Sequence, residues 1–156
     1  MQKLPIYHIF IMLAVIILLS ACGEEGEIMP QAIDEEIDVC EVCYMMVPDN
    51  QFGAQIVTGD GKVYKFDDIG CMAMYINDYN PDGAVFSRDF YTNEWIEIDK
   101  SMFVATTDVE TPMNYGYVSF GSRENLEKFL TESNGEEVNW ADILENQKER
   151  SNHDEN

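Results

Sequence analysis

Apolar and polar residues alternate in short blocks between residues 52 and 140, which predicts a series of short strands and helices. Two β-prone stretches at 52–58 and 63–66 flank a Gly-Asp-Gly turn, so a hairpin is expected there. Further strands are predicted in the stretches 84–91, 95–98, 102–106 and 115–120, with a short extended piece at Val138. Helices are predicted from Asp67 or Asp68 to about residue 78, from 122 to 132, and from Trp140 onward.

The first two predicted helices belong to a weak internal repeat. Residues 64–68 align with residues 118–122, and the apolar helix positions then coincide at i, i+3 and i+4. These matched positions are Met72, Tyr75 and Ile76 in the first helix and Leu126, Phe129 and Leu130 in the second. The pattern predicts an α+β fold of two small related strand–strand–helix halves that share one core.

The N-terminus has the pattern of an export signal. An apolar stretch from Ile9 to Leu19 is shorter than the roughly 20 residues that a membrane span needs. It ends in Leu-Ser-Ala-Cys22, which resembles a bacterial lipobox, although a plain signal peptide with a chance cysteine is an alternative. We therefore expect residues 1–21 to be a lipoprotein signal peptide. Cys22 would then carry acyl chains such as palmitate and anchor an extracytoplasmic protein to the bacterial cell membrane.

Composition sets the predicted boundaries of the exported chain. Residues 22–36 are rich in Gly, Glu and Pro without apolar periodicity, so they predict a flexible acidic tether. Residues 37–145 hold the predicted elements and form the expected domain. Residues 146–156 contain no apolar side chain and are predicted to be a disordered tail.

Charge and histidine content exclude several classes of function. The chain of 156 residues has 9 Lys and Arg against 30 Asp and Glu, a formal net charge of −21. Such a surface repels phosphate backbones and anionic membranes, so no nucleic-acid partner is expected and membrane attachment must be through lipid. Its two histidines, His8 and His153, lie in the leader and in the tail. Imidazole is therefore not expected to take part in metal binding or catalysis.

The densest chemistry is a run of sulfur residues at 40–46, Cys-Glu-Val-Cys-Tyr-Met-Met. A zinc site normally has four ligands, and the exported domain has only three thiols besides Cys22. A Cys-x-x-Cys pair also suits thiol–disulfide exchange or a passive disulfide. Thiolates with thioethers favour Cu(I), with Cys40, Cys43 and Met45 as the expected metal ligands. The roles of Met46, Cys71 and Met113 stay open.

These motifs together resemble the NosL family of copper-binding lipoproteins. The resemblance covers about residues 22–144 and is carried by Cys40-x-x-Cys43-x-Met45-x-Val47, Ala54-Gln55-Ile56, Asp60-Gly61-Lys62, Phe66-Asp67-Asp68 and Pro112-Met113-Asn114-Tyr115-Gly116. One departure is Tyr44, which stands where the family pattern usually has glycine.

The resemblance implies a function as well as a fold. NosL-type proteins bind Cu(I) outside the cytoplasm and pass it toward the copper centres of nitrous oxide reductase, with the help of a membrane-bound maturation complex. Their fold of two small α+β halves is similar to that of organomercurial lyase. We thus expect a copper chaperone and not an enzyme, with Cys40, Cys43, Met45 and a further candidate, Met113, as its sulfur positions. Alternatives are an exported Cys-x-x-Cys thiol–disulfide lipoprotein and a structural lipoprotein with an inert bridge.

Overall fold

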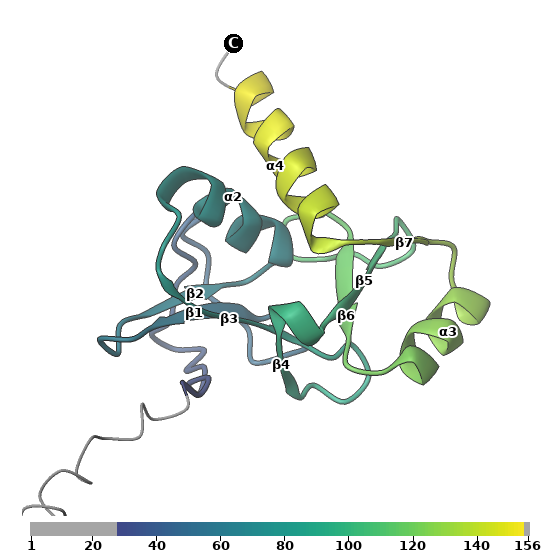
Figure 1. Ribbon diagram of the computed structural model, residues 1–156, viewed down its shortest axis with the longest axis horizontal. Coiled ribbons are helices and arrows are strands. Elements are labelled where there is room, and N and C mark those ends of the chain that lie inside the picture. Colours follow the sequence, from purple (N-terminus) through teal and green to yellow (C-terminus); the bar gives the residue numbers. More distant parts are fainter. Residues whose placement is uncertain (1–27, 155–156) are drawn as a thin grey trace, which may run out of the picture.

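The computed structural model of the chain describes residues 28–154, and an antiparallel sheet forms its first half (Figure 1). Its strands are β1 (Ala54–Thr58), β2 (Val63–Phe66), β3 (Gly83–Arg88) and β4 (Trp95–Glu97), in the order β2-β1-β3-β4. The pairing of β1 with β2 runs from Ala54 opposite Phe66 to Val57 opposite Val63, which confirms the predicted hairpin. β1 lies between β2 and β3 and is buried along most of its length.

A smaller sheet forms the second half. Its strands are β5 (Met102–Ala105), β6 (Tyr117–Phe120) and β7 (Glu136–Val138), in the order β6-β5-β7, and the 3-10 turn η1 (Ile98–Lys100) leads into it. In each half a hairpin leads into a helix, α2 (Ile69–Tyr79) or α3 (Arg123–Glu132), and the next strand returns to pair with the first strand of the hairpin. The predicted α+β class is confirmed, and the order β2-β1-β3 in the first sheet matches the order β6-β5-β7 in the second.

Both helices begin at capping side chains that the sequence contains. Asp68 Oδ1 accepts a hydrogen bond from the Gly70 N–H at 2.7 Å, and Ser122 Oγ accepts one from the Asn125 N–H at 3.2 Å. α2 ends at Asn80, whose left-handed backbone lets its N–H bond to the Ile76 carbonyl at 2.9 Å. Because Asp68 is the cap, the neighbouring Asp67 carboxylate is not needed to begin α2.

The two halves meet in a shared apolar core. Ile69 and Ala73 of α2 pack with Phe103 and Tyr117 of the second sheet and with Ile143 near the C-terminus. The backbone also joins the halves beyond β3, where the Phe90 N–H bonds to the Ser119 carbonyl of β6 at 2.9 Å. Ile98, Tyr115 and Trp140 also pack against buried clusters of both halves, so these side chains connect the two parts of the core.

The prediction of a disordered tail from residue 146 is wrong for the described residues. Helix α4 spans Trp140–Asp154 and packs against α2 on the same side of the sheets (Figure 1). Beyond residue 145 its polar residues still make contacts, since Gln147 is fully buried and the Arg150 guanidinium lies 5.1 Å from the centre of the Tyr115 ring. Glu, Gln, Lys and Arg are good helix formers, so the helix continues without an apolar stripe. Lack of apolar residues was thus a poor guide to disorder here.

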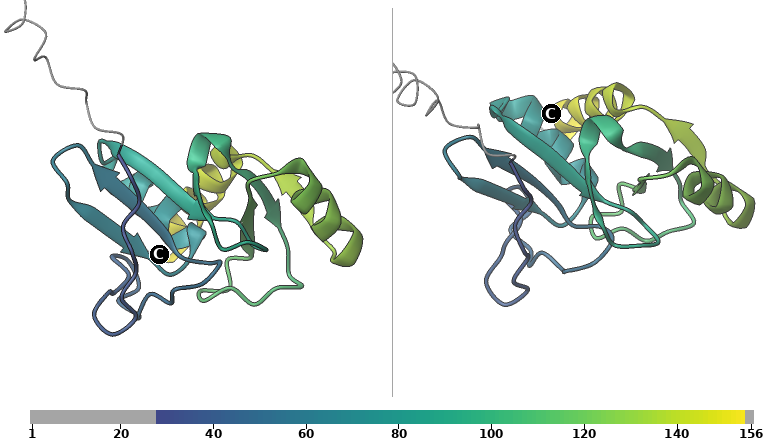
Figure 2. Two further views of the ribbon diagram at one scale, coloured as in Figure 1. Left: turned by 90° about the horizontal axis from the view of Figure 1, so that it is seen from below. Right: turned by 60° about the horizontal axis from the view of Figure 1, so that its bottom comes forward.

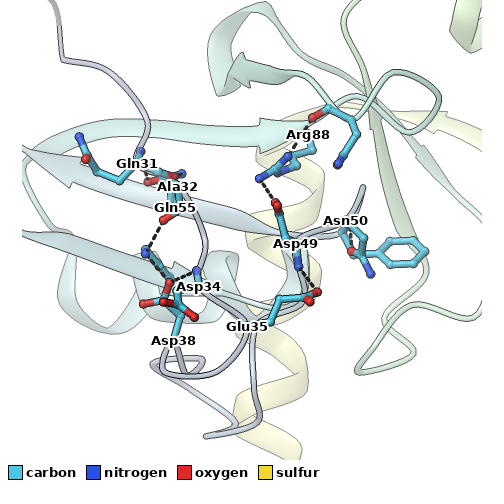
Figure 3. Close-up of polar contacts among 12 residues, drawn as sticks. Gln31, Ala32, Asp34, Glu35, Asp38, Asp49, Asn50, Gln55 and Arg88 are labelled. Atoms are coloured by element: carbon cyan, nitrogen blue, oxygen red, sulfur yellow. Dashed lines mark hydrogen bonds and ion pairs between the residues drawn. The ribbon is translucent and has the colours of Figure 1, made fainter.

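The prediction of a flexible tether over 22–36 is also wrong where the structure describes it. Gln31 and Gln55 of β1 exchange two hydrogen bonds, Gln31 N–H to Oε1 at 2.9 Å and Nε2–H to the Gln31 carbonyl at 3.0 Å (Figure 3). Ile33 is buried in the core of the first half. Seen from below, the described part of this segment, from residue 28 on, lies over the face of the first sheet opposite α2 (Figure 2, left). The buried Gln55 side chain thus anchors a segment whose composition predicts a flexible linker.

The predicted signal peptide (1–21) and the predicted lipidation site, Cys22, lie outside the described residues. Within residues 28–154, none of the helices has the length and apolar character that crossing a membrane requires.

Candidate metal centre

A tight turn between Val39 and Met46 holds the Cys-x-x-Cys motif. These two residues form an antiparallel bridge, and inside it the Cys40 N–H bonds to the Met45 carbonyl at 2.8 Å. The Tyr44 N–H bonds to the Cys40 carbonyl at 3.1 Å, and Tyr44 has a φ of +62°. This left-handed residue reverses the chain directly after Cys43. The turn therefore holds both thiols on one short, hydrogen-bonded loop.

The other wall of the site is the junction between β2 and α2. Asp67 follows the last residue of β2, and Cys71 lies in the first turn of α2. The Glu41 N–H donates to the Lys65 carbonyl at 3.1 Å, which ties the cysteine turn to β2. The cysteine turn and the β2–α2 junction, which are more than twenty residues apart in the sequence, thus lie side by side.

The site consists of four side chains, Cys40, Cys43, Asp67 and Cys71. Their ligand atoms all lie within 4.8 Å of one another. Cys40, Asp67 and Cys71 are fully buried, and Cys43 is half-buried. All three cysteines are free thiols, so no disulfide joins Cys40 to Cys43 in this structure.

Asp67 has one partnered and one unpartnered carboxylate oxygen. The Cys43 thiol donates to Asp67 Oδ2 at 3.3 Å. Oδ1 is buried and has no hydrogen-bond partner. Buried polar atoms are rarely left without a partner in folded proteins, so the unpartnered Oδ1 indicates a binding role for the Asp67 carboxylate.

The three thiols have very different acidities. Donation from the Cys71 thiol and from backbone N–H groups lowers the pKa of Cys40 to about 7, against the effect of burial. Burial raises the pKa of Cys43 to about 12. The hydrogen bond that Cys71 gives to Cys40 raises the pKa of Cys71, and its burial adds to this effect. Of the three thiols, Cys40 is therefore the first to lose its proton.

Of the predicted ligands, Cys40 and Cys43 are brought together, while Met45 is at the surface. Met45 and Met46 are 43% and 47% exposed. Metal binding by Met45 stays a prediction. Cys71, which the sequence left open between core packing and metal binding, joins the cluster.

The loop that carries Met113 is held by the cap of α2. Asp68 Oδ2 accepts hydrogen bonds from the Thr111 hydroxyl at 2.6 Å and from the Met113 N–H at 3.2 Å. Met113 is partly buried and packs against the core cluster that contains Cys40 and Cys71. The Tyr115 ring lies over Gly70, where a Cβ atom would be only 2.2 Å away. Absence of a side chain at Gly70 thus lets the 111–115 loop approach α2.

Asp67 is the site residue that the sequence did not predict. The sequence predicts Asp67 or Asp68 as the cap of α2, and the adjacent pair is itself a signal, because only one of the two aspartates can cap the helix. Its proximity to the thiols depends on how the loop at 39–46 folds back on β2. That contact is tertiary and has no local pattern.

Several exposed apolar side chains lie on the turn that carries Cys43, the least buried of the three thiols. They are Val39, Tyr44, Met45 and Met46, with 43–79% of their surface exposed, and Ile37 just before the turn is exposed as well. A partner that docks on this turn would come close to the Cys43 sulfur.

The comparisons with known proteins agree on one family. The sequence profile of the NosL family matches residues 30–147. Among solved structures, the crystal structure of the copper chaperone NosL from Shewanella denitrificans is similar to this chain, with a TM-score of 0.63 and 18% sequence identity. The similarity covers 72% of this chain and 93% of that one, and at this identity it shows a shared fold. No curated protein sequence matches the chain.

Proposed function

The chain belongs to the NosL family, and from this premise we propose that it is a membrane-anchored, extracytoplasmic Cu(I) chaperone. It would hold copper at the thiol cluster and deliver it for assembly of the copper centres of nitrous oxide reductase. Delivery would involve the membrane-bound maturation complex of that enzyme. The proposal assigns the protein binding and transfer of a metal, not catalysis.

The convergence of three free thiols carries this proposal. Thiolates are soft ligands, and they select Cu(I) over hard cations such as Mg²⁺ and Ca²⁺. Cys40, Cys43 and Cys71 have their sulfur atoms within 4.8 Å of one another, so one ion can contact all three. Met45 and Met113 are further sulfur donors that could bind as the ion enters or leaves.

The position of the site also suits transfer. Cys43 is half-buried and lies on the turn with the exposed apolar side chains, whereas Cys40 and Cys71 are buried. An incoming partner could exchange its own ligand for Cys43 first. Delivery to nitrous oxide reductase rests on the family alone, and extracytoplasmic anchoring rests on the lipobox at Cys22.

Competition titration of the reduced protein with a chromophoric Cu(I) chelator tests the proposal. We expect binding of one Cu(I), weakened at least about tenfold by Cys43→Ser and by Cys71→Ser. Met74→Leu is the matched control, since it removes a thioether that accepts from the Tyr115 hydroxyl and is not part of the thiol cluster. Failure to compete with the chelator, or equal binding by Cys43→Ser, would refute the proposal.

A second candidate function is thiol–disulfide exchange by Cys40 and Cys43. It is favoured by the lowered pKa of Cys40, about 7, and by the proximity of the two sulfurs. This alternative predicts catalysed disulfide exchange by the metal-free protein with a defined reduction potential. Loss of that exchange in Cys40→Ser, together with weak Cu(I) binding by the native chain, would favour it over the chaperone.

A further inference from the structure

We propose that an apolar pocket on the first sheet holds one acyl chain of the protein's own lipid anchor at Cys22. The inference rests on the proposed function only in taking Cys22 to be lipidated, and it makes no use of the metal centre. It gives the anchor a second role, which is to orient the folded domain at the membrane surface.

The pocket lies on the face of the first sheet that α2 does not cover. Phe86 of β3 is directly opposite Gln55 of β1, so both side chains point to the same face, and Gln55 is the residue that bonds to Gln31 of the N-terminal segment. This face, strand β4 and residues 28–30 enclose a pocket of about 390 Å³. Pockets that bind small apolar ligands typically have volumes of about 300–1,000 Å³.

The lining of the pocket is mainly apolar. Its apolar residues are Ile28, Met29, Pro30, Phe86, Trp95 and Ile96. The other two lining residues, Glu97 and Lys100, are exposed and form an ion pair with each other at 2.7 Å. The lining thus carries no net charge, although the whole molecule carries −21. Such a surface favours a hydrocarbon chain over a charged ligand.

The sequence before the pocket indicates which hydrocarbon chain can fill it. Cys22 precedes Ile28 by six residues, so even a fully extended backbone keeps the acylated cysteine within about 20 Å of the pocket. A tether this short raises the effective concentration of the acyl chain to roughly the millimolar range. Residues 23–27 are Gly-Glu-Glu-Gly-Glu and have no apolar side chain. Once the signal peptide is removed, the acyl chains would be the only apolar groups before residue 28.

Two other occupants fit the pocket less well. A second copy of the chain would bring together two molecules that each carry a net charge of −21, and these repel each other. A membrane phospholipid has the same acyl chemistry, but it lacks the tether that holds the Cys22 chains beside the pocket. The covalently attached chain is therefore the occupant that we propose.

An acyl chain in this pocket would leave the metal centre accessible. The pocket is at β4 and the cysteine turn bonds to β2, and these two strands are the opposite edges of the sheet. Helix α2, which carries Cys71, lies on the other face. Docking of the lipid would therefore turn the pocket face toward the bilayer that holds the other acyl chains, and the thiol cluster away from it.

Photo-crosslinking in intact cells tests the inference. Cells that express the full chain are grown with a palmitate analogue that carries a diazirine in its acyl chain, and are then irradiated. The purified protein is cut with a glutamate-specific protease, which separates Cys22 from Met29 and Trp95 because Glu24, Glu25, Glu27 and Glu94 lie between them. We expect mass spectrometry to find the acylated Cys22 peptide joined to the peptide that contains Met29 or Trp95.

A pair of variants links the crosslink to the pocket. Met29 is 58% exposed, so Met29→Asp places a charge in the lining without disturbing the core. We expect it to lower the yield of the crosslink to Trp95 at least about fivefold, because an acyl chain is disfavoured beside an unpaired charge. Ile37→Asp is the matched control: it makes a similar change at an apolar residue that is 73% exposed and does not line the pocket, so it should leave the yield unchanged.

The crosslinked products distinguish the possible occupants. Adducts of membrane phospholipid alone, or an equal yield in Met29→Asp, would overturn the inference and leave the lipid anchor in place. In a mixture of ordinary and ¹⁵N-labelled chains, crosslinks that join the two kinds of chain would also overturn it, because they would assign the pocket to a second copy. A Cys22 peptide without acyl chains would overturn both the anchor and this inference. None of these outcomes bears on Cu(I) binding, which the chelator titration tests separately.

Discussion

Tyr44 shows how a single residue shapes the candidate metal centre. Its φ of +62° is in the left-handed region, which costs a residue with a Cβ roughly 1–2 kcal/mol and costs glycine almost nothing. The family pattern usually has glycine at this place, and the turn keeps the left-handed conformation here despite the tyrosine. With 79% of its surface exposed, the Tyr44 side chain gains little packing in return. The left-handed conformation of Tyr44 thus destabilises the turn directly beside Cys43.

Replacing Tyr44 with glycine should therefore stabilise the protein. We expect Tyr44→Gly to raise the free energy of unfolding by about 0.5–1 kcal/mol, since the relieved strain exceeds the extra chain entropy of glycine. Urea unfolding of the metal-free reduced protein measures this change. Tyr44→Ala is the control, because it removes the ring but keeps the Cβ atom and should bring no gain. A destabilised Tyr44→Gly would mean that the exposed ring makes stabilising contacts.

The two helix caps make unequal contributions at the scale of elements. Ser122 gives α3 a single capping bond, whereas Asp68 caps α2 and also binds Thr111 and Met113. Asp68 is buried and Ser122 is exposed. Equivalent positions of the repeat thus differ in function: the cap in the first half also places a loop beside the metal centre.

We expect Asp68→Ala to be more destabilising than Ser122→Ala. Loss of the Ser122 cap should cost about 1 kcal/mol. Loss of Asp68 should cost about 2 kcal/mol or more, because the Thr111 hydroxyl and the Met113 N–H also lose their acceptor. Midpoints of urea unfolding at constant m-value give the comparison. Equal costs would show that the contacts of Asp68 with the 111–113 loop add nothing to stability.

Surface charge dominates the whole molecule. The formal net charge is −21, and at least four of the nine basic residues are already paired with carboxylates: Lys65 with Asp38, Arg88 with Asp49, Lys100 with Glu97 and Arg123 with Glu137. Arg88 also lies over the Trp95 ring at 4.0 Å, and its ion pair with Asp49 is drawn in Figure 3. A protein of this charge is repelled by an anionic membrane surface. Residence at the membrane therefore requires a hydrophobic anchor.

Cys22→Ser should release the protein from the membrane. Acyl chains stabilise anchoring by about 0.8 kcal/mol per buried CH₂ group, so their loss leaves a strongly acidic protein without attachment. Fractionation of cells, with mass analysis of the N-terminus, measures the change. Cys43→Ser is the control and should stay in the membrane fraction. Membrane retention of Cys22→Ser would argue against lipidation at this cysteine.

Local sequence signals predicted the elements better than their connections to one another. The hairpin at β1 and β2, the caps at Asp68 and Ser122 and the break at Asn80 follow from turn and capping chemistry that acts within a few residues. The predicted end of α4 near residue 145 is too early, because the helix is stabilised by tertiary contacts with α2 and with the Tyr115 ring. Polar residues at such positions look like solvent-exposed tail in sequence alone.

The sequence by itself determined the α+β class, the starts of its helices, the acidic surface and the choice of sulfur as the functional chemistry. Periodicity, capping and ligand softness are properties of residues and their near neighbours, so no tertiary information was needed. Only the tertiary structure decided that Cys71 and Asp67 join Cys40 and Cys43. These residues meet because the 39–46 turn is hydrogen-bonded to β2, and α2 starts directly after β2. The turn and this strand–helix junction are distant from each other along the chain. Whether a thiol belongs to a core or to a metal centre depends on such contacts, and no local pattern encodes them.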